Sequence, residues 1–249
     1  SVAPMLAAAG LRVIALDLPG FGYSERPRIF DYSIASQSRI VERFMNRLGI
    51  GAPALVGSSY GGAVAAMLAL DYPERVGKLI LVSPVTNDNP KRRLVMRLAA
   101  VPGIGEIITP FLADSISFHR RQMEKALAPA NHRLITSDRL EAIRRPLAAA
   151  DAHNSLLATA RNWSAERIEQ DAELLNQPTL IIWGEDDRII PIENGYRLHN
   201  KLLRSRMVVI RDCGHVPMEE KPEVFVSVVL DFCKDRFTPK EDENLPITR

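Results

Sequence analysis

Short apolar runs alternate with stretches of helical periodicity along much of this 249-residue chain. The runs are too short for helices and too continuously apolar for strands that have one face in water. Such runs are typical of a mostly parallel sheet that is covered by helices on both faces, an α/β architecture. The sequence predicts four or five strands of this kind, at residues 12–16, 54–56, 78–82, 179–183 and 207–210.

Two amphipathic helices are predicted to pack against this sheet. Apolar residues recur at helical spacing between Ile40 and Leu48 and again between Val224 and Phe232. Pro222 precedes the second pattern and suits the first turn of a helix, where its missing N–H costs nothing.

A long central segment does not follow the alternation. Residues 84–177 have helix-like patterns without clear strands. We therefore expect a core domain made of residues 1–83 and 178–249, interrupted by a helical cap at 84–177. The charged final stretch, residues 238–249, is expected to fray.

Composition excludes several classes of protein. The chain has 32 basic and 30 acidic residues, and a net charge of +2 gives no electrostatic reason to bind nucleic acid. Two cysteines, Cys213 and Cys233, make a disulfide framework implausible and permit a reducing, cytoplasmic location. Residues 50–70 are uncharged, but a proline, polar residues and glycines interrupt them, so no membrane span is expected. Ser1 begins neither a signal peptide nor a chain with an initiator Met, which suggests an N-terminal truncation.

The strongest chemical motif follows the second predicted strand. Residues 57–61 read Gly-Ser-Ser-Tyr-Gly, which matches the pattern G-x-S-x-G between a strand and a helix rich in small residues. A sharp turn there would expose the hydroxyl of Ser59 at the carboxyl end of the sheet and at a helix N-terminus. The alternative is an ordinary turn rich in glycine and serine.

A serine hydroxyl needs a base and a group that orients the base. Asp187 and His215 follow the last two predicted strands, and the order Ser, Asp, His differs from the orders of the serine proteases. Asp186 and Asp88 are rival acids. Four other histidines lack metal-ligand spacing and are expected at the surface: His119, His132, His153 and His199. We predict neither a metal nor a cofactor.

Four ordered motifs make the chain resemble the α/β-hydrolase superfamily, in the branch with a helical cap. They lie at residues 17–24, 57–62, 184–191 and 214–222. The resemblance implies that Ser59 is the nucleophile, His215 the general base and acid, and Asp187 the residue that fixes the tautomer of the histidine. It also implies that the backbone N–H of Tyr60 is an oxyanion donor.

One departure from the family pattern concerns the beginning of the chain. In the family, the second oxyanion donor follows a strand that lies between those expected at residues 12–16 and 54–56, and we expect this strand and its loop to be missing from the chain as given. We therefore expect a gap in the sheet. The loss of one oxyanion donor costs about 3 kcal/mol of transition-state stabilisation.

The substrate is expected to be a small molecule, and the cap is expected to select it. Apolar residues between Leu94 and Leu112 are interpreted as packing of the cap on the core, or as a wall that receives an acyl or aromatic group above Ser59. The basic run at residues 91–93 is interpreted as a solvated face. The sequence does not indicate an oligomeric state.

Within the superfamily, the residue types narrow the reaction. Haloalkane dehalogenases and epoxide hydrolases have an aspartate in place of Ser59, and carbon-carbon bond hydrolases typically have an aromatic residue where Val216 stands. We therefore expect a carboxylesterase that works through an acyl-serine intermediate. A carbon-carbon bond hydrolase, a haloperoxidase-like enzyme, and a non-catalytic binding protein or inactive fragment are the alternatives.

Overall fold

Four parallel strands form the sheet at the centre of the protein. The computed structural model describes residues 2–87, 101–149 and 151–235. The strands β1 (Ala54–Ser58), β2 (Lys78–Val82), β3 (Thr179–Gly184) and β4 (Ser205–Ile210) lie in the order β1-β2-β3-β4. All neighbouring pairs are parallel. The predicted α/β class is confirmed, and the carboxyl ends of all four strands meet at one edge.

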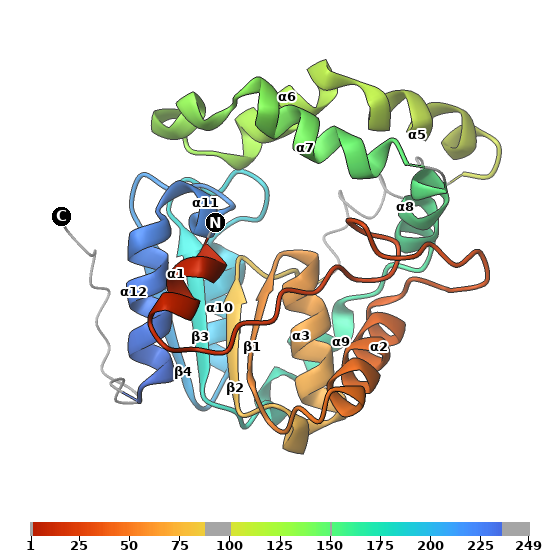
Figure 1. Ribbon diagram of the computed structural model, residues 1–249. Helices are drawn as coiled ribbons and strands as arrows, with labels where there is room; N and C mark the ends of the chain where they lie inside the picture. Colours follow the sequence, from red (N-terminus) through yellow and green to blue (C-terminus); the bar gives the residue numbers. More distant parts are fainter. Residues whose placement is uncertain (1, 88–100, 150, 236–249) are drawn as a thin grey trace.

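Helices cover both faces of this sheet (Figure 1). Leu79 and Leu81 of β2 point into a core shared with α2 (Ile34–Arg47), α3 (Tyr60–Asp71) and α10 (Glu193–Lys201). Ile80 and Val82 point to the opposite core, which α1 (Val2–Ala8) and α12 (Pro222–Cys233) complete. Because alternate residues of β2 are buried on opposite faces, the strand is continuously apolar from Leu79 to Val82.

The two predicted amphipathic helices are α2 and α12. Ser33 caps α2 by accepting a hydrogen bond from the backbone N–H of Ser36, and Pro222 occupies the first turn of α12 as expected. Shorter elements complete the core: η1 (Pro73–Arg75), α9 (Glu166–Gln170), η3 (Ala172–Leu174) and α11 (Pro217–Glu220).

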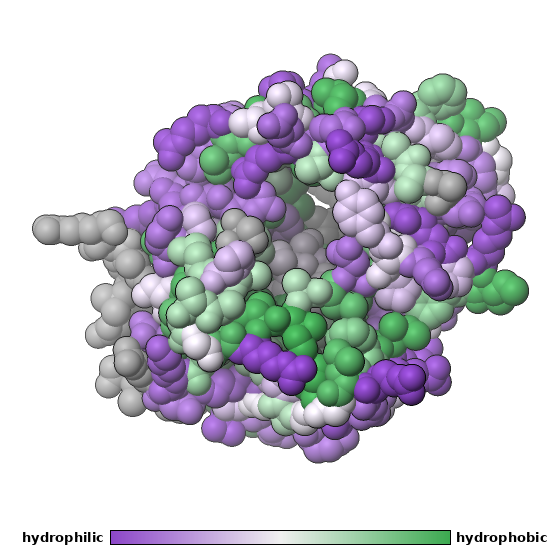
Figure 2. All heavy atoms as spheres, in the orientation of Figure 1, coloured by the Kyte–Doolittle hydropathy of each residue, from purple (hydrophilic) through white to green (hydrophobic). Residues whose placement is uncertain are grey.

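The prediction of a buried strand at residues 12–16 is wrong. This segment is irregular, and the side chains of Val13, Ile14 and Leu16 are exposed. Within the described residues β1 is hydrogen-bonded to β2 alone, and Val56 is 50% exposed. Figure 2 shows apolar surface over this part of the molecule. The segment has strand-like side chains, but none of the four described strands is hydrogen-bonded to it.

An unpaired edge with apolar side chains favours pairing between copies of a chain. We expect Val56→Lys to reduce self-association without loss of thermal stability, because the lysine would place a charge on a half-exposed position. Sedimentation velocity at several protein concentrations measures this, with Val56→Thr as the uncharged control. Equal association of the wild type and both variants would contradict the prediction.

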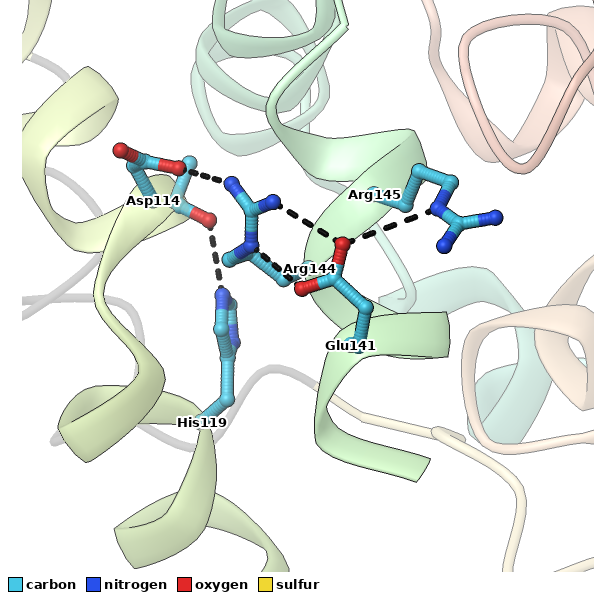
Figure 3. Close-up of polar contacts among 6 residues, drawn as sticks. Asp114, His119, Glu141, Arg144 and Arg145 are labelled. Atoms are coloured by element: carbon cyan, nitrogen blue, oxygen red, sulfur yellow. Dashed lines mark hydrogen bonds and ion pairs between the residues drawn. The ribbon is translucent and has the colours of Figure 1, made fainter. Parts of the chain in front are cut away.

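The cap follows β2 and lies across one end of the sheet (Figure 1). It contains α5 (Ile104–Asp114), α6 (Ile116–Ala126), η2 (Pro129–Leu134), α7 (Ser137–Leu147) and α8 (Ala152–Arg161). The expected bounds of 84–177 also include α9 and η3, but these two elements pack into the core with the sheet. Figure 3 shows Arg144 of α7 between Glu141, which is on the same helix, and Asp114, which is on α5. His119, expected at the surface, is buried, and its Nε2 lies 2.7 Å from the carbonyl oxygen of Ala113. These contacts join three cap helices into one unit.

The apolar residues of α5 are not packed as expected. Ile104, Ile107 and Phe111 are exposed, whereas the residues that face inward are Gly105 and Ala113. Small side chains let α5 approach α7 and α8 closely, and the large ones are then left outside. The remaining expectations for residues 88, 91–95, 98 and 238–249 lie outside the described residues.

A pocket of about 730 Å³ opens within the cap. It lies among α5, α7 and α8, and its lining includes Phe111, Arg144 and His153 but none of the residues predicted to be catalytic. The charge of Arg144 is already paired with Asp114 and Glu141. We therefore do not assign the chemistry to this pocket. In the described part of the chain, no helix has the length and hydropathy needed to cross a bilayer.

Candidate active site

Three predicted residues lie in loops at the carboxyl edge of the sheet. Ser59 follows β1, Asp187 lies beyond β3 and His215 lies beyond β4. The register pairs Ser58 with Val82, Val82 with Ile182 and Ile182 with Val208, so these loops leave the sheet on the same side. Parallel pairing thus brings together residues that are far apart in the sequence.

The turn at Ser59 has the backbone geometry that the motif predicts. Ser59 has φ +52° and ψ −115°, and its N–H donates to the carbonyl oxygen of Val82 at 2.9 Å. A Cβ on Gly57 would meet the backbone of Gly61, and a Cβ on Gly62 would lie 2.8 Å from Pro84. A Cβ on Gly61 itself would meet open space, so the close approaches that require glycine are at 57 and 62.

Asp187 and His215 form a buried pair. The Nδ1 atom of His215 lies 2.8 Å from Oδ2 of Asp187, and the Asp187 side chain is fully buried. The other carboxylate oxygen accepts hydrogen bonds from the N–H groups of Ile189 and Ile190, at 2.8 and 2.9 Å. Neither carboxylate oxygen is left without a donor, so the carboxylate is held in one orientation.

The ionised form of Asp187 is favoured. Burial raises the pKa of this carboxyl group, but the hydrogen bond and charge of His215 and the N–H of Ile190 outweigh burial and leave the pKa below its usual value. The rival Asp186 is held through its backbone, whose N–H donates to the carbonyl oxygen of Cys213, and the carboxylate hydrogen-bonded to His215 is that of Asp187. Asp88 lies outside the described residues.

Ser59 and His215 are not hydrogen-bonded to each other in the described structure, in which Asp187 is the side-chain partner of His215. The Ser59 residue is half-buried and His215 is 7% exposed. Hydrogen bonds between a nucleophile and its base are often long without substrate. The placement at one sheet edge leaves both residues as candidates.

The acid and histidine loops cross at two glycines. A Cβ on Gly184 would collide with the carbonyl oxygens of Gly214 and Cys213. The indole N–H of the neighbouring Trp183 donates to the carbonyl oxygen of Ile190 at 3.1 Å, and Trp183 is fully buried. The two loops therefore pack backbone against backbone, and neither can move closer to the other.

This crossing predicts a large loss of stability from one methyl group. We expect Gly184→Ala to lower the free energy of unfolding by about 3 kcal/mol, because the obstacle is backbone and cannot rotate away. Urea denaturation followed by circular dichroism measures the change. Gly51→Ala is the control, since a Cβ there meets nothing within 4 Å. Equal stabilities of the two variants would refute the expected collision.

Tyr60, predicted as an oxyanion donor through its backbone, is the first residue of α3. Its ring lies between Phe21 and Trp163, with centroid distances of 5.4 and 5.6 Å, and its hydroxyl donates to the carbonyl oxygen of Tyr32. Burial, with a contribution from the charge of Asp31, raises the pKa of the hydroxyl. The side chain is thus fixed and remains a neutral hydrogen-bond donor.

Sequence reasoning missed a buried acidic residue in the histidine loop. Glu220 is 7% exposed and accepts hydrogen bonds from the backbone N–H of Gly214 and from the cap. Its signal in the sequence is weak, because Glu219 is adjacent and exposed.

Among the described residues, no group of three His, Cys, Asp or Glu side chains could hold a metal ion. Burial raises the pKa of the free thiols of Cys213 and Cys233.

Comparison with known proteins assigns the family. The sequence model of the alpha/beta hydrolase fold matches residues 1–222. A 2-hydroxy-6-oxo-6-phenylhexa-2,4-dienoate hydrolase of Burkholderia cepacia is 31% identical over 238 residues, which cover 90% of this chain and 78% of that protein.

Solved structures agree with this assignment. A meta-cleavage product hydrolase of Pseudomonas fluorescens superposes with a TM-score of 0.80 at 24% identity, covering 95% of this chain and 84% of that one. A thermophilic esterase of Thermogutta terrifontis has a TM-score of 0.69 at 27% identity, with 89% and 79% covered. The chain therefore belongs to the alpha/beta hydrolase fold family and is a hydrolytic enzyme.

Proposed function

We propose that the protein is a serine carboxylesterase that acts on small esters with an apolar acyl or aromatic group. The observation that carries this proposal is the buried pair of Asp187 and His215 at the sheet edge where Ser59 stands in a strained turn. A carboxylate on Nδ1 keeps the proton at that nitrogen, which leaves Nε2 free to act as a base.

The reaction follows from these positions. Ser59 Oγ attacks the ester carbonyl carbon while its proton passes to Nε2 of His215. The C–O bond to the alcohol then breaks, and the alcohol leaves with that proton. A water molecule attacks the acyl-serine, giving its proton to His215, and the acid is released as Ser59 regains its hydroxyl hydrogen.

Negative charge on the carbonyl oxygen would be stabilised at the start of α3. The N–H of Tyr60 is in the first turn of that helix, where donors are not used by the helix itself. The Tyr60 side chain is immobilised by Phe21 and Trp163, which supports a fixed direction for this donor.

Hydrolysis of a carbon-carbon bond is the second candidate. Its support is the 31% identity with a dienoate hydrolase of Burkholderia cepacia. The residue after the histidine favours the esterase, because Val216 packs in a small apolar cluster with Met123, Leu127 and Leu140 of the cap. These three cap side chains are buried, so position 216 is occupied by an aliphatic core residue, and no aromatic side chain stands there next to His215.

Two assays run in parallel decide between these reactions. We expect hydrolysis of short p-nitrophenyl esters to exceed that of 2-hydroxy-6-oxo-6-phenylhexa-2,4-dienoate in kcat/KM, and a fluorophosphonate to label the Ser59 peptide. Protein labelled beforehand is the control for background hydrolysis. A reversed preference would replace the esterase by the carbon-carbon hydrolase, and protein without labelling or turnover would refute both proposals.

A further inference from the structure

A buried carboxylate joins the histidine loop to the cap. Glu220, at the end of α11, accepts a hydrogen bond on Oε1 from the N–H of Gly214 at 2.8 Å. Its Oε2 accepts two more, from the N–H of Ala128 and from Nδ2 of Asn131, both at 2.8 Å. One side chain thus binds the residue before His215 and two residues of the cap.

Other contacts hold the same two segments together. The N–H of His215 donates to the carbonyl oxygen of Ala126 at 2.6 Å, and Asn131 also donates to the carbonyl oxygen of Asp212 at 2.9 Å. Gly214 approaches the cap so closely that a Cβ on it would lie 2.8 Å from the nitrogen of Ala128. The backbone of residues 212–215 is therefore fixed by cap residues 126–131 on one side and by the acid loop on the other.

We propose that Glu220 is a positioning residue for His215. Its carboxylate fixes the backbone at Gly214 against the cap, and this sets the imidazole in its hydrogen bond with Asp187 and in its direction toward Ser59. The inference rests on the proposed role of His215 as the base. Its physical basis is that a buried carboxylate that accepts several N–H groups resists displacement, because each unpaired donor would cost free energy in a dry site.

The adjacent glutamate, Glu219, provides a comparison, because it links the core to the cap at a different place. Glu219 is also on α11 and also reaches the cap, where its Oε2 lies 2.9 Å from a guanidinium nitrogen of Arg139. That pair is partly exposed, with 45% of the Glu219 side chain accessible. Among the described residues its carboxylate pairs with Arg139 of the cap and not with the histidine loop, so Glu219 serves as the matched control.

The decisive variants are Glu220→Gln and Glu219→Gln. Glutamine keeps the size of the side chain but places an NH₂ group against either the N–H of Gly214 or the two cap donors. We expect Glu220→Gln to lower kcat for the p-nitrophenyl ester about tenfold or more, with KM changed by no more than about twofold. Fluorophosphonate labelling of Ser59 should slow by the same factor. Glu219→Gln should match the wild type in all three measurements.

A spectroscopic readout separates positioning from general damage. We expect the proton between Nδ1 of His215 and Oδ2 of Asp187 to give a far-downfield NMR resonance, which its absence in His215→Ala would assign. We expect Glu220→Gln to shift or broaden this resonance at unchanged circular dichroism, and Glu219→Gln to leave it in place. The pH profile of labelling should change in Glu220→Gln alone.

Two results overturn the inference. One is a Glu220→Gln protein that equals Glu219→Gln in kcat and in the resonance. The other applies if Glu220→Gln does not fold. Asn131→Ala removes one donor to Glu220 together with the hydrogen bond to Asp212, and it leaves the contact between Glu220 and Gly214. This variant should lower kcat severalfold and move the resonance, and an unchanged resonance refutes positioning. Because the resonance requires no turnover, this test remains valid even if no ester is hydrolysed.

Discussion

Replacement of Ser59 by alanine is expected to lower kcat for p-nitrophenyl esters by about 10⁴-fold or more, because no other group on the pathway can form the acyl intermediate. The variant should fold normally. Alanine bears the same Cβ as serine at φ +52°, so the cost of this backbone conformation does not change. Initial rates measure kcat, active-site titration measures formation of the acyl intermediate, and the melting temperature measures folding.

The neighbouring serine provides the matched control. Ser58 is the last residue of β1 and carries a hydroxyl one position away. Ser58→Ala should retain turnover and fluorophosphonate labelling. Ester hydrolysis that persists at the wild-type rate in purified Ser59→Ala protein would exclude Ser59 as the nucleophile.

Asp187→Asn is expected to reduce kcat at neutral pH by about 10⁴-fold. The N–H groups of Ile189 and Ile190 occupy Oδ1, so the oxygen of the asparagine would remain there and its NH₂ group would face His215. An NH₂ group can only donate to Nδ1, which moves the imidazole proton to Nε2 and removes the base.

The pH dependence of stability gives a second measurement on the same variant. The pKa of Asp187 lies below its ordinary value of 3.8 in the folded protein. A group with a lowered pKa stabilises the fold above its unfolded pKa, and that stability is lost as the pH falls through the folded pKa. The difference in free energy of unfolding between wild type and Asp187→Asn should thus be full at pH 7 and vanish in strong acid.

Asp186→Asn is the control for both measurements, because Asp186 adjoins Asp187 without contacting the histidine in the described structure. It should keep the wild-type rate and the wild-type acid dependence. If instead Asp186→Asn loses activity while Asp187→Asn keeps it, the acid has been assigned to the wrong residue.

Most of the core could be predicted from the sequence because its signals are local. The continuous apolar run of β3 indicates a strand that is buried on both faces. The glycines around Ser59 indicate a turn that has no room for side chains. Parallel pairing then dictates that Asp187 and His215 reach the same edge. The fold class and the proximity of these two residues follow from such constraints.

The features that could not be predicted depend on contacts between segments that are far apart in the sequence. Residues 12–16 have the composition of a strand, but a strand needs a neighbour, which no local pattern supplies. The orientation of α5 was also hidden, because its buried side is made of Gly105 and Ala113 and not of its large apolar residues. Glu220 could not be distinguished from Glu219 until the fold showed which carboxylate points inward.

The two tryptophans of the chain provide optical reporters of the site. Trp183 lies beneath the acid loop through its bond to Ile190, and Trp163 rests against the ring of Tyr60. Trp183 is fully buried, so its emission reports on an interior without water. Trp163 is half-buried and lies where the chain returns from the cap to the sheet. We therefore expect the tryptophan fluorescence of the unlabelled protein to change when a molecule binds next to Ser59.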